Sequence, residues 1–167
     1  MEGPAWLQTA LGYLDLQMFE ETWKALDELK EKQQQTLETL DLRIRCRLDE
    51  GRFEEAFQWC QNMKERFPEE HSVYIQGAFC LHEMGKTSEA QDWLQSGPSS
   101  LQIEAKYFYN LGCYDLALGH EESASAWLKQ AFEMEPTYLA DALKDPDFEP
   151  ILARIAEMDD DADELFS

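Results

Sequence analysis

A repeat period of 34 residues is the feature that most constrains the fold of this chain. Three columns of identical residues share this step: Gly51, Gly85 and Gly119; Ala56, Ala90 and Ala124; Trp59, Trp93 and Trp127. Three residue types at three different positions all recur with the same step, and such agreement is not expected by chance. A fixed period of this length indicates repeated units that each pack against the next one.

A weaker copy of the same unit lies upstream. The stretch MFEETWKAL (18–26) aligns with RFEEAFQWC (52–60), but Gln17 replaces the glycine and Thr22 replaces the alanine. This copy begins the array, where an atypical unit is expected because one of its faces meets water.

Each unit is predicted to hold two helices. Apolar residues at three- and four-residue steps precede each glycine, which ends the first helix in a conformation that side chains resist. The small residue five positions later lets the two backbones approach closely, and the tryptophan covers the seam with the neighbouring unit. Pro68 and Pro136 stop the second helix. Helices are expected near 4–16, 19–32, 36–50, 53–66, 70–84, 87–95, 101–118, 121–134, 137–144 and 149–157.

The stretch FYNLGCYDLALGHEESASAWLKQAFEMEP (108–136) resembles a tetratricopeptide repeat (TPR). The matching residues are Phe108, Leu111, Gly112, Gly119, Ala124, Ala131 and Pro136. The following stretch, YLADALKDPDFEPILARI (138–155), is similar to the capping segment of many bacterial TPR proteins. The third unit departs by ending early at SGPSS (96–100), and the second carries Arg43 and Arg47 where apolar residues are usual.

This resemblance implies an all-α fold, a right-handed superhelical solenoid of about four TPR helix pairs plus a C-terminal capping helix. We expect a single domain over 1–158, with units near 3–36, 37–70, 71–104 and 105–138 and a cap at 139–158. Residues 159–167 are expected to form an acidic flexible tail.

In TPR proteins the first helices line a concave groove that holds a peptide of another protein. Carried over by position, the groove residues are Leu7, Leu11, Asp41, Arg45, Ile75, Gln76, Phe79, Tyr109, Asn110 and Cys113. The resemblance therefore implies a non-enzymatic adaptor or scaffold that binds a partner segment. A small acidic chaperone for one client, as in type III secretion, is the alternative, and a structural assembly factor that uses its convex face is a third. We also expect that two copies of the chain can associate through the first repeat.

Packing is the competing interpretation of several groove and surface residues. Ile75, Phe79 and Tyr109 are also consistent with contacts to one another or to the C-terminus of the chain. The tryptophan column favours a packing ladder over a convex docking surface, since a large ring buries much area. Leu165 and Phe166 at the end of the tail suggest a placeholder for the groove, although a solvated acidic end is the simpler interpretation.

Charge separates the classes of partner. The formal net charge is -21; residues 1–68 hold 14 acidic and 9 basic side chains, and residues 69–167 hold 21 and 5. Nucleic acid is therefore not an expected partner, because phosphates require a basic footprint. A basic peptide or protein is expected to be steered to the C-terminal half.

The stretch RIRCR (43–47) is the one basic cluster. Arg43 and Arg47 share a helix face and are expected to pair with glutamates, the candidates being Glu20, Glu21, Glu54 and Glu55. Arg45 points elsewhere, toward the groove, and is the better candidate to hold a ligand carboxylate.

No pattern in the sequence predicts a catalytic, metal or cofactor site. Cys46, Cys60, Cys80 and Cys113 are spread singly, which suits buried apolar side chains in a reducing compartment. His82 and His120 each start an HExxH pattern, but the second histidine of the pair is missing in both. An enzyme is not expected.

Location is predicted from what the sequence lacks. No apolar run approaches the roughly 18–20 residues that span a bilayer. The first 21 residues, MEGPAWLQTALGYLDLQMFEE, contain acidic residues in place of a basic start and a long apolar stretch. We therefore expect a cytoplasmic protein with no membrane partner.

Overall fold

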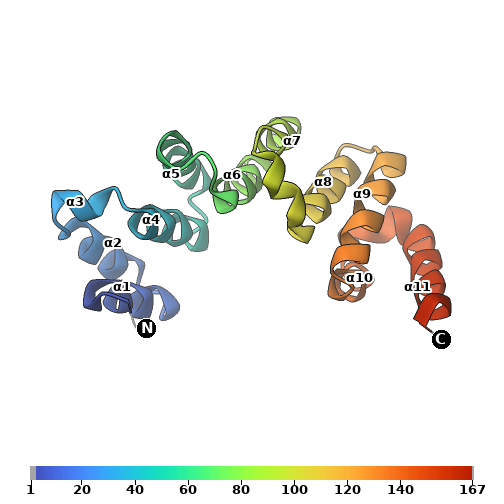
Figure 1. Ribbon diagram of the computed structural model, residues 1–167, viewed down its shortest axis with the longest axis horizontal. Helices are drawn as coiled ribbons and strands as arrows, with labels where there is room; N and C mark the ends of the chain where they lie inside the picture. The colour runs from blue at the N-terminus through green and yellow to red at the C-terminus, as the bar shows by residue number, and fades with distance from the viewer. Residues whose placement is uncertain (1–2, 167) are drawn as a thin grey trace. The chain divides into compact units, whose positions relative to one another are not determined.

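Helices account for all regular secondary structure in the part of the chain that the structure, a computed structural model, describes. This part is the backbone of residues 3–166, with the side chains of residues 159 and 161–166 outside the description. The chain divides into two compact units, Met1–Lys86 and Thr87–Ser167, each of which is described by itself. Figure 1 shows the order of the helices along the chain.

Unit 1 contains two complete helix pairs, a short helix between them and one further helix. Its helices are α1 (Ala5–Asp15), α2 (Phe19–Asp27), α3 (Glu31–Gln34), α4 (Leu37–Asp49), α5 (Phe53–Arg66) and α6 (His71–Glu83). Helix α1 packs on α2, α4 packs on both α2 and α5, and α5 packs on α6. Apart from α2 and α3, these bounds lie close to those predicted from the repeat.

Unit 2 contains one complete helix pair and the C-terminal cap. Its elements are α7 (Thr87–Gln95), the 3-10 helix η1 (Ser99–Ile103), α8 (Ala105–Ala117), α9 (Glu121–Met134), α10 (Thr137–Ala142), η2 (Pro146–Ile151) and α11 (Leu152–Phe166). Helix α8 packs on α9, and α10, η2 and α11 all contact α9. The expected third repeat falls across the boundary, with α6 in unit 1 and α7 in unit 2.

Three expected helices differ from the observed ones. The helix expected over 19–32 ends at Asp27, because the side-chain amide of Gln34 donates to the carbonyl oxygens of Leu26 and Leu29 and so supplies partners for the end of α2. The helix expected over 101–118 begins only at Ala105, after η1. The one expected over 149–157 begins at Leu152 and continues through Phe166, into the segment for which a flexible tail was expected.

The small-residue column is fully buried, as predicted. Ala56, Ala90 and Ala124 have no exposed surface, and neither has Thr22 in the first copy of the repeat. The Thr22 hydroxyl donates to the carbonyl oxygen of Met18 at 2.8 Å, so its polar atom does not remain unsatisfied. A hydroxyl therefore fits this column only because the preceding turn accepts its hydrogen bond.

The turn after each first helix has the predicted left-handed residue. Gly51, Gly85 and Gly119 have φ angles of +73°, +77° and +80°. At Gly51 the amide donates to Leu48 and the next amide, that of Arg52, donates to Arg47, which is the Schellman pattern. Gln17, exactly one period upstream, makes the same pair of bonds with φ +58°.

Replacing Gln17 with glycine is expected to stabilise the protein. A side chain in the left-handed region costs about 1–2 kcal/mol, which glycine avoids. Glycine in turn makes the unfolded chain more flexible, which offsets about 0.5–1 kcal/mol of that stabilisation. We expect the free energy of unfolding in urea to rise by about 0.5–1 kcal/mol. The reverse change, Gly85→Ala, should lower it, since a Cβ there meets open space and φ alone opposes it. A fall with Gln17→Gly would contradict this account.

Gly112 is required for a different reason, the close contact of α8 with α9. A Cβ at this position would lie 2.6 Å from Cγ of the fully buried Leu128. We expect Gly112→Ala to lower the free energy of unfolding by about 1–3 kcal/mol, as overpacked cores do. Gly12→Ala is the matched control: it lies within α1 with open space around it, so better helix propensity should stabilise by about 0.5–1 kcal/mol. Equal effects of the two changes would contradict the packing argument.

Candidate functional site

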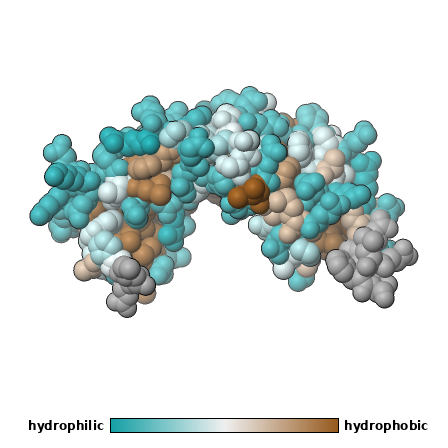
Figure 2. All heavy atoms as spheres, in the orientation of Figure 1, coloured by the Kyte–Doolittle hydropathy of each residue, from teal (hydrophilic) through white to brown (hydrophobic). Residues whose placement is uncertain are grey.

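The predicted groove residues of unit 1 lie on the first helix of each pair. Leu7 and Leu11 are on α1, Asp41 and Arg45 on α4, and Ile75, Gln76 and Phe79 on α6. All seven keep some exposed surface. Figure 2 shows hydrophilic residues over most of the visible surface, with apolar residues exposed in smaller areas.

The α1 residues divide their surface between the core and solvent. Leu7 and Leu11 pack against a buried cluster that includes Ala10, Leu14 and Leu26. Both remain partly exposed on α1. They are therefore held in place by the core and still offer apolar surface to a guest.

The polar residues of α4 and α6 meet through one hydrogen bond. Nε2 of Gln76 donates to Oδ1 of Asp41 at 3.4 Å, and so links the first helices of successive pairs. Burial raises the pKa of the Asp41 carboxyl, while the charge of Arg45 and the Gln76 hydrogen bond lower it by less. Arg45 itself forms no direct ion pair or hydrogen bond to the described residues, unlike Arg43, Arg47 and their neighbours. Its donors are thus available for a guest.

Phe79 is the large aromatic side chain that the described part of the chain exposes most, at 41%. Its ring meets that of Phe53 edge to face, with centroids 6.0 Å apart and planes at 78°. This contact fixes one side of the ring and leaves the other to solvent. An aromatic side chain that is exposed but held in place is suited to contact a partner protein, either by filling a pocket of the partner or by being covered by it.

In unit 2 the predicted groove residues lie against the cap of the chain. The ring of Tyr109 stacks on that of Tyr138, with centroids 4.8 Å apart, and lies 5.8 Å from that of Phe148. Cys113 packs against the same cluster, and burial, with the charges of nearby carboxylates, raises its thiol pKa to about 12. Asn110 is half-buried. Tyr109 therefore packs against the C-terminal part of the chain, as the packing interpretation expected.

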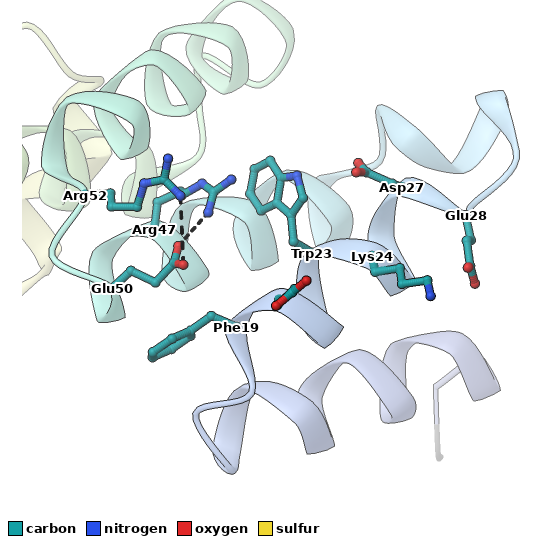
Figure 3. A pocket seen from close by; sticks show the side chains of 9 residues that line it. Phe19, Trp23, Lys24, Asp27, Glu28, Arg47, Glu50 and Arg52 are labelled. Atoms are coloured by element: carbon teal, nitrogen blue, oxygen red, sulfur yellow. Dashed lines mark hydrogen bonds and ion pairs between the residues drawn. The ribbon is translucent and has the colours of Figure 1, made fainter.

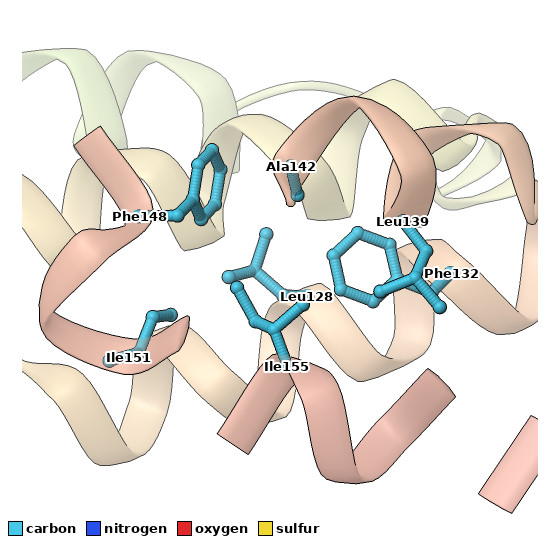
Figure 4. Close-up of a cluster of buried hydrophobic side chains, with 7 residues drawn as sticks. All are labelled: Leu128, Phe132, Leu139, Ala142, Phe148, Ile151 and Ile155. Atoms are coloured by element: carbon cyan, nitrogen blue, oxygen red, sulfur yellow. The ribbon is translucent and has the colours of Figure 1, made fainter. Parts of the chain in front are cut away.

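Seven buried residues form the core under the cap. Figure 4 shows their side chains pointing toward one another from α9, α10, η2 and α11. They are Leu128, Phe132, Leu139, Ala142, Phe148, Ile151 and Ile155. The cap is therefore part of the core of unit 2.

The tryptophan column serves packing in two ways. The ring of Trp59 meets that of Trp23 in the preceding helix pair, with centroids 5.8 Å apart, so it covers a seam as predicted. Trp127 instead contacts Phe108 of its own pair at 5.9 Å. Trp59, Trp93 and Trp127 are all half-buried. Trp23 does not belong to the column, and the periodicity gave no signal for its role.

Arg43 and Arg47 are buried against tryptophan rings, with 4% and 9% of their surface exposed. The guanidinium of Arg47 lies 3.6 Å from the centroid of Trp23, and Arg43 lies over both Trp23 and Trp59. Arg47 pairs with Glu55 at 3.0 Å, one of the predicted glutamates, and with Glu50 at 2.6 Å.

The prediction of a glutamate partner was wrong for Arg43. Its NH2 group donates to Oδ1 of Asp27 at 3.0 Å and to Oε1 of Gln34 at 2.7 Å. The guanidinium lies over the ring of Trp23 on α2, and Asp27 is the last residue of that helix.

An open pocket of about 480 Å³ lies beside Arg47, on the α2 side (Figure 3). Phe19, Glu20, Trp23, Lys24, Asp27, Glu28, Arg47, Glu50 and Arg52 line it. Figure 3 shows the carboxylate of Glu50 joined by dashed lines to the arginines, so Arg47 and Arg52 already have a carboxylate partner. The pocket was not predicted, because it results from a tertiary contact that no single repeat position encodes.

The described residues form neither a metal-binding cluster nor a membrane-spanning helix. Within residues that the structure describes, no group of three or more His, Cys, Asp or Glu side chains is arranged to hold a metal ion. None of the described helices combines the length and apolar character needed to cross a membrane. Cys46, Cys60 and Cys80 are buried free thiols, and Cys113 is half-buried.

No family model matches the chain, and no curated protein matches it. Among solved structures, a "Crystal structure of MamA protein" superposes with a TM-score of 0.76, over 95% of this chain and 88% of that chain, at 14% identity. A "Crystal structure of MamA" gives a TM-score of 0.75, over 98% of this chain and 99% of that chain, at 13% identity. At such identity the likeness shows the fold alone. It confirms the expected fold class, an all-α solenoid of TPR-like helix pairs.

Proposed function

We propose that the protein is a non-enzymatic interaction module that binds a segment of a partner protein on the first-helix face of unit 1. We define this face by Leu7 and Leu11 on α1, Asp41 and Arg45 on α4, and Ile75, Gln76 and Phe79 on α6. The observation that carries the proposal is the exposure of Phe79 beside polar groups whose hydrogen-bonding capacity is incompletely used. The TPR-like fold supports it, since such faces are rigid and laterally repeated.

The chemistry of the face suits a peptide chain. Half-buried Ile75 and exposed Phe79 offer area for apolar side chains of the guest. Arg45 can donate to a carbonyl or carboxylate oxygen, and Asp41 can accept from a backbone amide. Binding sites of this kind combine an apolar lining with a few polar groups that fix orientation.

Affinity capture from the native cell extract tests the proposal. The variant Ile75→Glu with Phe79→Glu places two charges on the first-helix face, and we expect it to lose at least about tenfold of the bound partner, as the loss of an interface anchor does. The control, Gln58→Glu with Gln61→Glu, adds the same charge at exposed positions of α5.

The outcomes separate the alternatives. Loss of one partner in the first variant alone supports the proposal, whereas retention by both variants excludes this face as the site. The recovered partner then distinguishes two roles: an adaptor binds a protein that is folded on its own, and a chaperone binds a client that aggregates without it.

A further inference from the structure

A second surface, on unit 2, presents aromatic rings beside unneutralised carboxylates. Tyr109 of α8 and Tyr138 of α10 stack with ring planes at 23°, and both are half-buried. Phe148 lies beneath them with 1% of its surface exposed. The buried ring of Phe148 supports that of Tyr109, and both tyrosines keep some exposed surface.

Carboxylates lie close to these two rings along the chain, since Asp141 follows Tyr138 by one turn of α10 and Asp145 caps η2, which holds Phe148. Burial raises the pKa of both hydroxyls, and the charges of Asp141 and Asp145 raise that of Tyr109 further, as those of Glu135 and Asp141 do for Tyr138. These groups are therefore within electrostatic reach of the rings. None of the ion pairs found among the described residues includes these three carboxylates.

The charge of the surroundings is predominantly negative. Unit 2 holds 18 acidic and four basic residues, so its formal charge is -14. Its segment 133–149 holds six acidic residues and one lysine. An acidic guest would be repelled here, whereas a cation gains from both the carboxylates and the faces of the aromatic rings.

We propose that the surface formed by Tyr109, Tyr138, Asp141 and Asp145 binds a lysine- or arginine-bearing segment of a partner protein. A guest cation lies against the exposed ring surface, and the carboxylates neutralise it. This rests on the proposed function, because it assigns a partner chemistry to the same module, but it concerns unit 2 and not the first-helix face of unit 1.

Fluorescence anisotropy with labelled octalysine and octaarginine tests the proposal. We expect Asp141→Asn with Asp145→Asn to weaken binding about fivefold, from the loss of two charge contacts, one from an exposed and one from a half-buried side chain. Asparagine keeps the side-chain oxygen with which Asp145 accepts from the Asp147 amide, so η2 stays capped. The control, Glu121→Gln with Glu122→Gln, removes the same charge from exposed positions of α9 and should weaken binding less than about twofold.

The rings are tested separately from the charges. Tyr138→Leu keeps apolar bulk but removes the ring face, and should weaken binding about threefold. Backbone amide NMR shifts on adding octaarginine should concentrate on α8, α10 and η2. Equal weakening by both carboxylate pairs, or no weakening by either, would overturn the proposal, since binding would then follow net charge alone or another surface.

The two proposals fail independently. Ile75→Glu with Phe79→Glu should leave octaarginine binding within about twofold, because those positions are on unit 1. If that variant retains its partners in the extract while the Asp141 and Asp145 pair weakens octaarginine binding, the first-helix face fails and the cation site stands. If the reverse holds, the cation site alone fails.

Discussion

Replacing Phe148 with alanine is expected to lower the free energy of unfolding of the protein by about 3–5 kcal/mol, the cost of a large cavity in a packed core. Phe148 lies in η2 with 1% of its surface exposed, among Leu128 and Ile155 of α9 and α11. Its ring also supports that of Tyr109, at 5.8 Å. Urea unfolding followed by circular dichroism measures the change.

A control substitution distinguishes the loss of a buried side chain from the loss of any side chain in the cap. Leu143→Ala alters a side chain near the end of α10 that is 38% exposed, and should cost less than about 1 kcal/mol. If Phe148→Ala costs no more than this control, η2 is only loosely attached. The description of the cap as part of the core would then be wrong.

Replacing Arg43 with alanine is expected to cost about 3 kcal/mol or more. The change removes a guanidinium that is 4% exposed, its bonds to Asp27 and Gln34, and its contacts with two tryptophan rings. Breaking a buried ion pair from one side commonly costs about 3–5 kcal/mol, although Asp27 can regain water here because its side chain is 58% exposed. The measurement is again the free energy of unfolding in urea.

Two further variants divide this cost into charge and packing. Arg43→Met fills most of the same volume and should cost about 1–2 kcal/mol less than alanine, because cavities add to the loss. Arg52→Ala removes an arginine whose side chain is 49% exposed, and should cost less than about 1 kcal/mol. Equal costs for alanine and methionine at position 43 would show that packing contributes little at this site.

The sequence predicted those parts of the fold that depend on local and repeated signals. The helix pairs follow from the period, and the turns follow from Gly51 and its equivalents, whose left-handed backbone is a local requirement. Even Gln17, which lacks the favoured residue, adopts the same turn because the helices on either side impose it.

Other parts depend on tertiary contacts and could not be predicted in this way. The end of α2 is set by Gln34, eight residues from the carbonyl of Leu26 that it contacts, and no local stop signal marks it. The partner of Arg43 is Asp27, at the end of α2, a contact that depends on how α4 packs on α2. The cap covers much of Tyr109, which a position-by-position transfer from other repeats does not reveal.

The site is less determined by sequence than the fold. The transfer of groove positions places Ile75, Gln76 and Phe79 together on α6, and their use in binding stays a prediction. The suggestion that Leu165 and Phe166 fill the groove concerns side chains that lie outside the described residues. Charge composition pointed to the C-terminal half, but only the structure groups Tyr138 and Asp141 with Tyr109.

Hydrogen–deuterium exchange of the purified protein with its captured partner tests the central claim most directly. Partner binding on the first-helix face of unit 1 predicts slower exchange in α1, α4 and α6, around Asp41 and Phe79, with little change in α2 and α5. Slower exchange confined to α2 and α5 would contradict that claim, because the partner would then contact the second helices of the pairs.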